Sequence, residues 1–248
     1  MILTAAARTD VGRRRTENED SFALAPRLGM YLVADGMGGH TAGQLASRLA
    51  TRGCVAALRE LAESRATLTE KLRACVEAAN REVYETAQAK PELTGMGTTL
   101  VVLLAGAGRI ALAHVGDSRA YLIRAGTIRR LTDDHSLVAE LVRRQEISEE
   151  SARGHPHRHV LTRALGVRRI VEPDLAELTP QAGDAVVLCS DGLTTHVEDA
   201  EIAAVATKER DVEAICARLV DLANARGGED NVTVALVRVD PDPAPDPA

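Results

Sequence analysis

The stretch Met30-Tyr31-Leu32-Val33-Ala34-Asp35-Gly36-Met37-Gly38-Gly39-His40 joins an apolar run to a glycine-rich turn, and a long helical pattern follows it. The apolar run predicts a buried strand that ends at Asp35. A strand end fixes the direction of a carboxylate, and the neighbouring Gly36 lets a backbone carbonyl or a water approach a hard cation. Taken alone, Asp-Gly is also a common turn pair. The stretch therefore predicts either a plain turn or a metal-binding corner.

Four further acidic motifs lie beside apolar runs along the chain. They are Asn18-Glu19-Asp20, Gly116-Asp117-Ser118-Arg119, Ser190-Asp191-Gly192 and Glu229-Asp230-Asn231. One such motif carries little information, because Asp and Asn are frequent in turns and caps. Several of them in one domain indicate that distant segments converge on a carboxylate-rich site for a divalent cation.

The pattern around these motifs predicts an α+β fold. The expected strands are 2–7, 21–25, 30–34, 98–104, 109–115, 120–124, 127–131, 174–178, 184–189 and 231–239. The expected helices are 42–62, 68–89, 136–144, 148–153, 200–206 and 212–224. The block from 98 to 131, with tight connections at 106–108 and 125–126, predicts an antiparallel meander. Elements in this order predict two antiparallel sheets with helices on their outer faces, in one domain.

The composition is that of a globular protein without a nucleic-acid surface. The 248 residues fit one domain, and 45% of them are hydrophobic. Aromatic residues make up only 2%, which argues against stacking platforms for nucleic-acid bases. A net charge of -6 also disfavours a broad surface for a phosphate backbone.

The sequence further predicts a cytoplasmic monomer that does not contact membranes. No apolar stretch approaches the roughly 18 residues of a membrane span, and the first residues lack the pattern of a signal peptide. The cysteines stand singly in apolar patterns, so we expect them to be buried and reduced. No amphipathic seam is left over for a second subunit.

Seven motifs stand in order along residues 8–239. They are Asp10-Val11-Gly12-Arg13-Arg14-Arg15-Thr16-Glu17-Asn18-Glu19-Asp20, Val33-Ala34-Asp35-Gly36-Met37-Gly38-Gly39-His40, Gly97-Thr98-Thr99, Val115-Gly116-Asp117-Ser118-Arg119-Ala120-Tyr121, Leu161-Thr162-Arg163-Ala164-Leu165-Gly166, Ser190-Asp191-Gly192-Leu193 and Glu229-Asp230-Asn231-Val232-Thr233. Together they resemble the metal-dependent protein phosphatases of type 2C, in particular the small bacterial members.

The resemblance implies an αββα sandwich, in which two antiparallel β-sheets are flanked by helices. The phosphatase domain is expected to span residues 1–239, and the segment at about 133–166 corresponds to a mobile flap beside the active site. The Pro- and Asp-rich ending, 240–248, is expected to be a disordered tail.

The resemblance also implies a binuclear metal centre. Asp35 is expected to bridge two divalent cations, and the carbonyl of Gly36 is expected to ligate one of them. Asp191 and Asp230 complete the set, and Asp117 is expected to help bind a third, weaker ion. Ligation by oxygen alone favours manganese or magnesium.

The remaining roles concern the phosphoryl group and the attacking water. Arg15 is the expected phosphate clamp, because a guanidinium holds two phosphate oxygens in a fork. A run of arginines is otherwise a solvated face, and only the spacing to Asn18-Glu19-Asp20 selects Arg15. Glu19 is expected to hold a metal-bound water, and Asp20 is expected to support the centre from behind. An exposed acidic turn is the alternative for both.

Three positions depart from the family pattern. Thr195 stands where many eukaryotic members have a further aspartate, which weakens the expected third metal site. Met37 stands where animal members have a histidine, so the general acid is unassigned between His40 and a bound water. His159 replaces an asparagine that is frequent in bacterial relatives.

We therefore expect a phosphoserine/phosphothreonine protein phosphatase that acts on phosphorylated proteins and opposes a bacterial Ser/Thr kinase. A water activated at the binuclear centre is expected to attack phosphorus directly and in line. Two alternatives use the same fold. One is a regulatory pseudophosphatase that binds phosphopeptides without turnover, and the other is a phosphatase of a partner-switching protein or of small phosphate esters.

Overall fold

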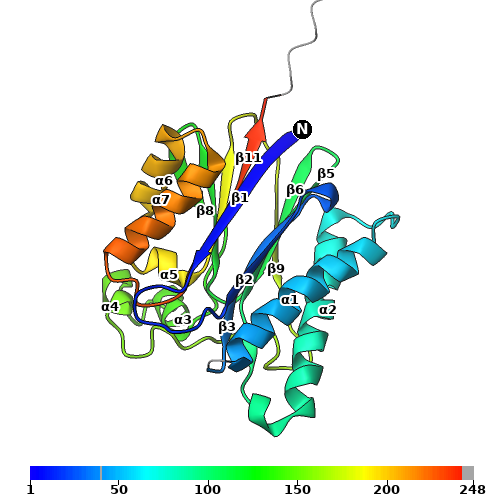
Figure 1. Cartoon of the computed structure of the whole chain (residues 1–248), viewed down its shortest axis with the longest axis vertical. Helices are drawn as coiled ribbons and strands as arrows, with labels where there is room; N and C mark the ends of the chain where they lie inside the picture. The colour runs from blue at the N-terminus through cyan, green and yellow to red at the C-terminus, as the bar shows by residue number, and fades with distance from the viewer. Residues whose placement is uncertain (40, 242–248) are drawn as a thin grey trace, which may run out of the picture.

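Two antiparallel β-sheets stack on each other in the computed structural model, which describes residues 1–39 and 41–241 (Figure 1). The first sheet contains β1 Ile2–Asp10, β7 Arg119–Arg124, β8 Thr127–Arg130, β10 Ala185–Cys189 and β11 Val232–Asp240, in the order β1-β11-β10-β7-β8. The second contains β2 Asp20–Ala25, β3 Met30–Met37, β4 Gly97–Thr98, β5 Leu100–Gly106, β6 Arg109–Val115 and β9 Asp174–Leu178, in the order β2-β3-β5-β6-β9 with β4 beside β3.

Helices cover the outer faces of both sheets. The long helices α1 (Thr41–Glu60) and α2 (Leu68–Ala89) pack on the second sheet, and α6 (Asp199–Lys208) and α7 (Val212–Ala225) pack on the first (Figure 1). The shorter helices are α3 Leu137–Arg143, α4 Glu149–Arg153 and α5 Asp191–Thr194, and 3-10 turns lie at Pro26–Leu28 and Pro91–Leu93. This confirms the expected αββα sandwich.

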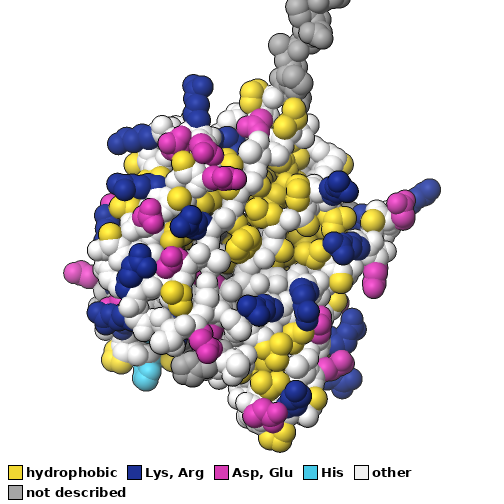
Figure 2. Space-filling model, viewed as in Figure 1, with side chains coloured by type: hydrophobic (Ala, Val, Ile, Leu, Met, Phe, Trp, Pro, Cys, Tyr) yellow, Lys and Arg dark blue, Asp and Glu magenta, His cyan; other side chains and the backbone are white. Residues whose placement is uncertain are grey.

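The hydrophobic core lies in three layers between these elements. Successive residues of β3 face different layers, because side chains alternate along a strand. Leu32 packs towards α1 and α2, whereas Val33 packs between the sheets together with Leu188 and Val237. Figure 2 shows hydrophobic side chains gathered on the face between β1 and α1. The half-buried Phe22 packs against the layer of the core that lies between the sheets.

The cap and the apolar stripe that predict α2 from the sequence are both present in the structure. Thr67 caps the helix, since its hydroxyl accepts a hydrogen bond from Glu70 N and the Glu70 carboxylate accepts one from Thr67 N. The apolar stripe is buried, with Leu72, Val76 and Val83 at the centre. The expected bounds, 68–89, agree with the helix. All four cysteines are buried and free.

The expected meander over 98–131 is wrong. β5 and β6 form one hairpin in the second sheet, and β7 and β8 form another in the first. The pairing breaks between them, because β6 pairs with β9 instead and β7 pairs with β10. The short connection 116–118 therefore crosses from one sheet to the other, and it carries Asp117 to the end of the sandwich.

Some expectations lie at or beyond the edge of the described residues. β11 ends at Asp240, and 242–248, which make up most of the expected tail, lie outside the described residues, as does His40. None of the described helices combines the length and the apolar character needed to cross a bilayer. The helix α5, which the sequence pattern did not predict, begins at Asp191.

Candidate metal centre

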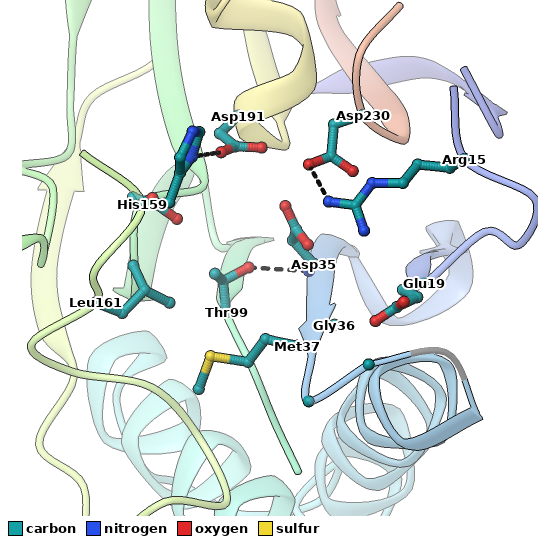
Figure 3. Close-up of a pocket in the computed structure, with 13 residues that line it drawn as sticks. Arg15, Glu19, Asp35, Gly36, Met37, Thr99, His159, Leu161, Asp191 and Asp230 are labelled. Atoms are coloured by element: carbon teal, nitrogen blue, oxygen red, sulfur yellow. Dashed lines mark hydrogen bonds and ion pairs between the residues drawn. The ribbon is translucent and has the colours of Figure 1, made fainter. Parts of the chain in front are cut away.

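The expected carboxylates meet at one end of the sandwich. Asp35 near the end of β3, Asp191 at the start of α5 and Asp230 just before β11 line one hollow of about 410 Å³. Their side chains point towards one another across it (Figure 3). Both sheets contribute, so the hollow forms only when the sandwich closes.

Asp35 is held by its own backbone. Its N–H donates to Thr99 Oγ1 at 2.9 Å, and its carbonyl accepts from Thr99 N and from Thr98 Oγ1, each at 2.8 Å. The next residue has no room for a side chain, since a Cβ on Gly36 would lie 2.0 Å from Gly43 O. The Gly36 backbone therefore packs directly on the start of α1, and the strand end is fixed in direction.

Asp230 is positioned by Asn231, which ties three segments together. The buried Asn231 amide donates to the carbonyls of Val11 and Glu17, each at 2.9 Å, and its oxygen accepts from Glu19 N at 2.8 Å. Its own N–H donates to Asp230 Oδ1 at 2.8 Å. The loop that carries Arg15 and Glu19 is thus anchored to the start of β11.

Burial and mutual repulsion make the carboxylates costly to ionise. Burial, followed by the charges of Asp20, Asp191 and other neighbouring aspartates, raises the pKa of Asp35 well above its usual range. Burial, followed by the charge of Asp191, raises the pKa of Asp117 to about 8. Desolvation also raises the pKa of Asp20 to about 7. A bound cation would offset this repulsion, so buried carboxylates that repel one another favour cation binding.

The donor set fits divalent cations that prefer oxygen. Asp20 is buried, and its Oδ1 has no hydrogen-bond partner within the described chain. This leaves an oxygen at the back of the site that can still accept a hydrogen bond or a cation contact. The lining otherwise offers carboxylates, the Gly36 carbonyl and the Thr99 hydroxyl. Oxygen ligands of this kind match manganese or magnesium rather than a thiolate metal such as zinc.

Arg15, which its spacing to Asn18-Glu19-Asp20 selects in the sequence, lies at the rim of the hollow. Its Nη2 donates to Asp230 Oδ2 at 2.8 Å (Figure 3), and its side chain is 48% exposed. The neighbouring Arg14 turns away and pairs with Glu229 at 3.3 Å. Of these two arginines, only Arg15 therefore faces the carboxylates.

Glu19 and Asp20 are both buried, so they do not form an exposed acidic turn. Glu19 lines the hollow, and its carboxylate lies so close to α1 that a Cβ on Gly43 would be 1.8 Å from Glu19 Oε2. Asp20 is the antiparallel partner of Asp35 on β2. Its Oδ2 accepts from Ser190 Oγ at 2.7 Å, which links the two sheets behind Asp35.

Asp117 and His159 line the side of the hollow next to Asp191. Asp117 reaches it through the crossing from β6 to β7. His159 Nδ1 lies 3.8 Å from Asp191 Oδ2 (Figure 3), and this contact raises the pKa of His159. Thr195 N donates to Asp191 O at 2.8 Å within the turn of α5. Thr195, which stands where many eukaryotic members have an aspartate, thus supports the backbone of Asp191 and offers no carboxylate.

A second cluster of possible ligands, His114, His135 and Asp174, does not suit a metal. One possible ligand atom from each of the three lies within 4.8 Å of the others. However, Gly116 N donates to His135 Nδ1 at 3.0 Å, so a neutral His135 carries its proton on Nε2, which lies 3.3 Å from Asp174 Oδ2. A cation at Nε2 would require loss of that proton.

Several residues of this site have no role that the sequence alone indicates. Thr99 and Asn231 were noted only as parts of motifs, and the structure makes them the groups that hold Asp35 and Asp230. Met37 and Leu161 form an apolar wall of the hollow. The signal for Thr99 was a hydroxyl pair between two predicted strands, and no local pattern indicated its partner 64 positions away.

Comparison with known proteins settles the family. The family described as Protein phosphatase 2C matches residues 10–232. The chain belongs to this family. It is 42% identical to the serine/threonine phosphatase stp of Listeria monocytogenes over 246 residues, which cover 96% of each protein.

Solved structures of relatives have the same fold as this family member. The Mycobacterium tuberculosis serine/threonine phosphatase PstP/Ppp superposes with a TM-score of 0.88 at 40% identity, covering 97% of this chain and 100% of that one. The catalytic domain of PstP in complex with two manganese ions gives a TM-score of 0.85 at 39% identity, covering 96% of this chain and 99% of that one.

Proposed function

We propose that the protein hydrolyses phosphoserine and phosphothreonine in phosphorylated proteins, with two manganese or magnesium ions as cofactors. The single observation that carries the proposal is the meeting of Asp35, Asp191 and Asp230 in one hollow. Membership of the protein phosphatase 2C family and the manganese-bound PstP relative support the same chemistry.

The residues that would hold the ions are Asp35, Asp191 and Asp230 through their carboxylates and Gly36 through its carbonyl, and Asp35 would serve both ions. When bound, the ions lower the pKa of a shared water and offset charge on the phosphoryl oxygens. Cys189 lies two residues before Asp191 and is the cysteine closest in sequence to a proposed ligand. It does not compete with water as the nucleophile, because burial raises the pKa of its thiol to about 12. Direct hydrolysis by water follows.

The surrounding residues bind and orient. Arg15 exchanges its contact with Asp230 for a forked pair of hydrogen bonds to the phosphoryl group. Glu19 holds the attacking water in place, and Asp20 supports the centre from behind, next to Asp35 across the β2–β3 pairing and bonded to Ser190. Asp117 contributes, with Asp191, to a third and weaker cation site.

The wider assignment follows from these roles. Residues 1–239 form the phosphatase domain, and the segment 133–166 is a flap over the hollow. The protein acts as a monomer in the cytoplasm and opposes a Ser/Thr kinase. A role in binding without turnover needs a broken set of carboxylates, and the set here is complete.

The proposal is tested by phosphate release from a phosphothreonine peptide with manganese or magnesium. We expect turnover that EDTA abolishes and that Asp35→Asn reduces by at least about 1,000-fold. The matched control is Asp133→Asn, since Asp133 is 74% exposed and does not line the hollow. Absence of turnover by the unmodified protein with either metal contradicts the proposal and favours a phosphopeptide-binding role.

A further inference from the structure

A second hollow of about 410 Å³ lies directly beside the catalytic one. The two share Met37 and Leu161, which stand in Figure 3 on the side away from Arg15 and Asp230. The remaining wall comes from the end of the expected flap, at Thr162–Ala164, and from the segment that follows it, which includes Val167, Ile170 and Val171. The apolar wall of the catalytic hollow therefore continues into a second, mainly aliphatic one.

The second hollow presents unusually exposed aliphatic side chains. Ile170 is 81% exposed and Val167 is 53% exposed, whereas Val171 between this segment and the core is buried. No described residue covers Ile170. An exposed isoleucine next to an active site is typical of a contact surface, because the side chain gains stability only when a ligand buries it.

The segment that carries these side chains is firmly held. The buried Asn80 of α2 donates to the carbonyls of Arg168 and Arg169, each at 3.1 Å, and accepts from Gly166 N at 2.9 Å. The surface is therefore preformed, so that a ligand need not order the backbone before it binds.

The rim of the second hollow carries positive charge that has no partner among the described residues. Arg168 lines the hollow and Arg169 follows it in the chain; both are exposed, and neither pairs with a carboxylate in the described part of the chain. The acidic lining residue Glu172 lies 3.9 Å from Arg73. Arg163, by contrast, is neutralised by an ion pair with Asp174 at 2.5 Å. An occupant of this surface would gain from an apolar side chain followed by acidic ones.

We propose that the second hollow binds the substrate polypeptide next to its phosphorylated residue. An apolar side chain packs on Ile170 and Val167, and acidic residues beyond it contact Arg168 and Arg169. This inference rests on the proposed function. The shared wall at Met37 and Leu161 indicates the occupant, because a chain whose phosphoryl group lies in the first hollow can continue past this wall into the second. An extended chain advances roughly 3.3 Å per residue, so the adjoining hollow is within reach of a side chain a few positions from the phosphorylated one.

The experiment compares three phosphothreonine peptides of equal length. The first carries Leu three residues on either side of the phosphothreonine and Glu beyond each Leu. In the second, Ser replaces Leu, and in the third, Lys replaces Glu. The enzymes are the unmodified protein, Ile170→Ser and Arg168→Glu. The control variant is Ile2→Ser, which changes an exposed isoleucine, 45% exposed, on β1.

We expect kcat/KM of the unmodified protein to be about tenfold higher for the leucine peptide than for the serine peptide. Ile170→Ser should bring that ratio close to one, and Ile2→Ser should leave it unchanged. Arg168→Glu should reverse the preference for Glu over Lys, and added salt should weaken the preference of the unmodified protein. Hydrolysis of p-nitrophenyl phosphate, which has no flanking residues, should be equal in all four proteins.

Equal leucine and serine values in the unmodified protein, or a leucine preference that survives in Ile170→Ser, overturns the inference. A self-association that sedimentation detects and that Ile170→Ser alone disrupts, without a change in peptide preference, assigns the surface to a second copy and also overturns it. Failure to hydrolyse p-nitrophenyl phosphate contradicts the proposed function instead. The same ratios are then measured by fluorescence anisotropy of labelled peptides, which tests the hollow without turnover.

Discussion

Arg15 and Asp230 illustrate, at the scale of single residues, how an arginine pairs with a carboxylate of the hollow. In the structure the guanidinium lies 2.8 Å from the Asp230 carboxylate and so partly offsets the charge of a crowded acidic hollow. When cations bind the carboxylates in place of Arg15, the same fork of N–H groups is available to a phosphoryl group. The residue next to it, Arg14, has the same charge and faces Glu229.

Arg15→Lys is expected to lower kcat/KM for a phosphothreonine peptide by about 10- to 100-fold, because lysine cannot form the forked contact. Most of the loss should appear in KM if the arginine binds the ground state as tightly as the transition state. Steady-state kinetics measure it, with Arg14→Lys as the matched neighbour. Equal losses in both variants would show that general positive charge matters and not the fork.

His135 predicts a specific pH dependence of stability. It is 2% exposed, and burial, followed by the charges of His114 and Arg163, lowers its pKa to about 4. The unfolded chain takes up a proton at about pH 6.5, so below that value the unfolded state binds more protons than the folded one. The contribution of a neutral His135 is complete above pH 6.5 and is lost as the pH falls towards 4.

His135→Gln should therefore flatten the decline of unfolding free energy between pH 6.5 and pH 4 by about 3 kcal/mol. Denaturant unfolding of metal-free protein at several pH values measures this, and the titration of the site carboxylates cancels in the difference between variants. The exposed His157 provides the control variant His157→Gln, which should keep the original slope. An unchanged slope in His135→Gln contradicts the assignment.

Secondary-structure elements were predictable where local pattern determines them. The bounds of α2 follow from its cap and apolar stripe, and both tight hairpins were placed correctly, with Ala107 and Gly108 at φ 48 and 72. The crossing between β6 and β7 was missed for a physical reason. Both strands are buried on both faces along most of their length, so no alternation shows which sheet each one joins.

The site was predictable to the extent that it consists of carboxylates at element ends. Asp35, Asp191 and Asp230 stand out because an acidic residue next to an apolar run and a glycine or asparagine recurs several times in one domain. The groups that hold them are not, since Thr99 and Asn231 act through hydrogen bonds to partners 64 and 212 positions away. The roles of the individual residues stay predictions.

Asn231 connects the start of β11 to the loop before β2, so its loss should destabilise the whole site. Asn231→Ala removes three hydrogen bonds of a buried amide, to Val11, Glu17 and Glu19, and is expected to destabilise the protein by about 2–3 kcal/mol. The control is Asn224→Ala, because Asn224 is equally buried but its amide has no hydrogen-bond partner within the described chain. Thermal unfolding compares the two, and an Asn224→Ala loss as large as that of Asn231→Ala would contradict this view.

At the scale of the molecule, the centre exists because two sheets close on each other. Asp35 comes from the second sheet, Asp230 precedes a strand of the first, and Ser190 bonds to Asp20 across the interface. Segments that lie at opposite ends of the sequence thus share one hollow. The buried, mutually repelling carboxylates that result favour cation binding over the metal-free state.

The measurement that tests this account most directly is calorimetric titration of manganese into the metal-free protein. We expect two strong sites, the number of ions in the PstP relative, in the unmodified protein and in Asp133→Asn. Asp35→Asn should lower the affinity by at least about 100-fold, because it removes the carboxylate that we propose as a ligand of both ions. If Asp35→Asn binds two manganese ions as tightly as the unmodified protein, the binuclear centre proposed here is wrong.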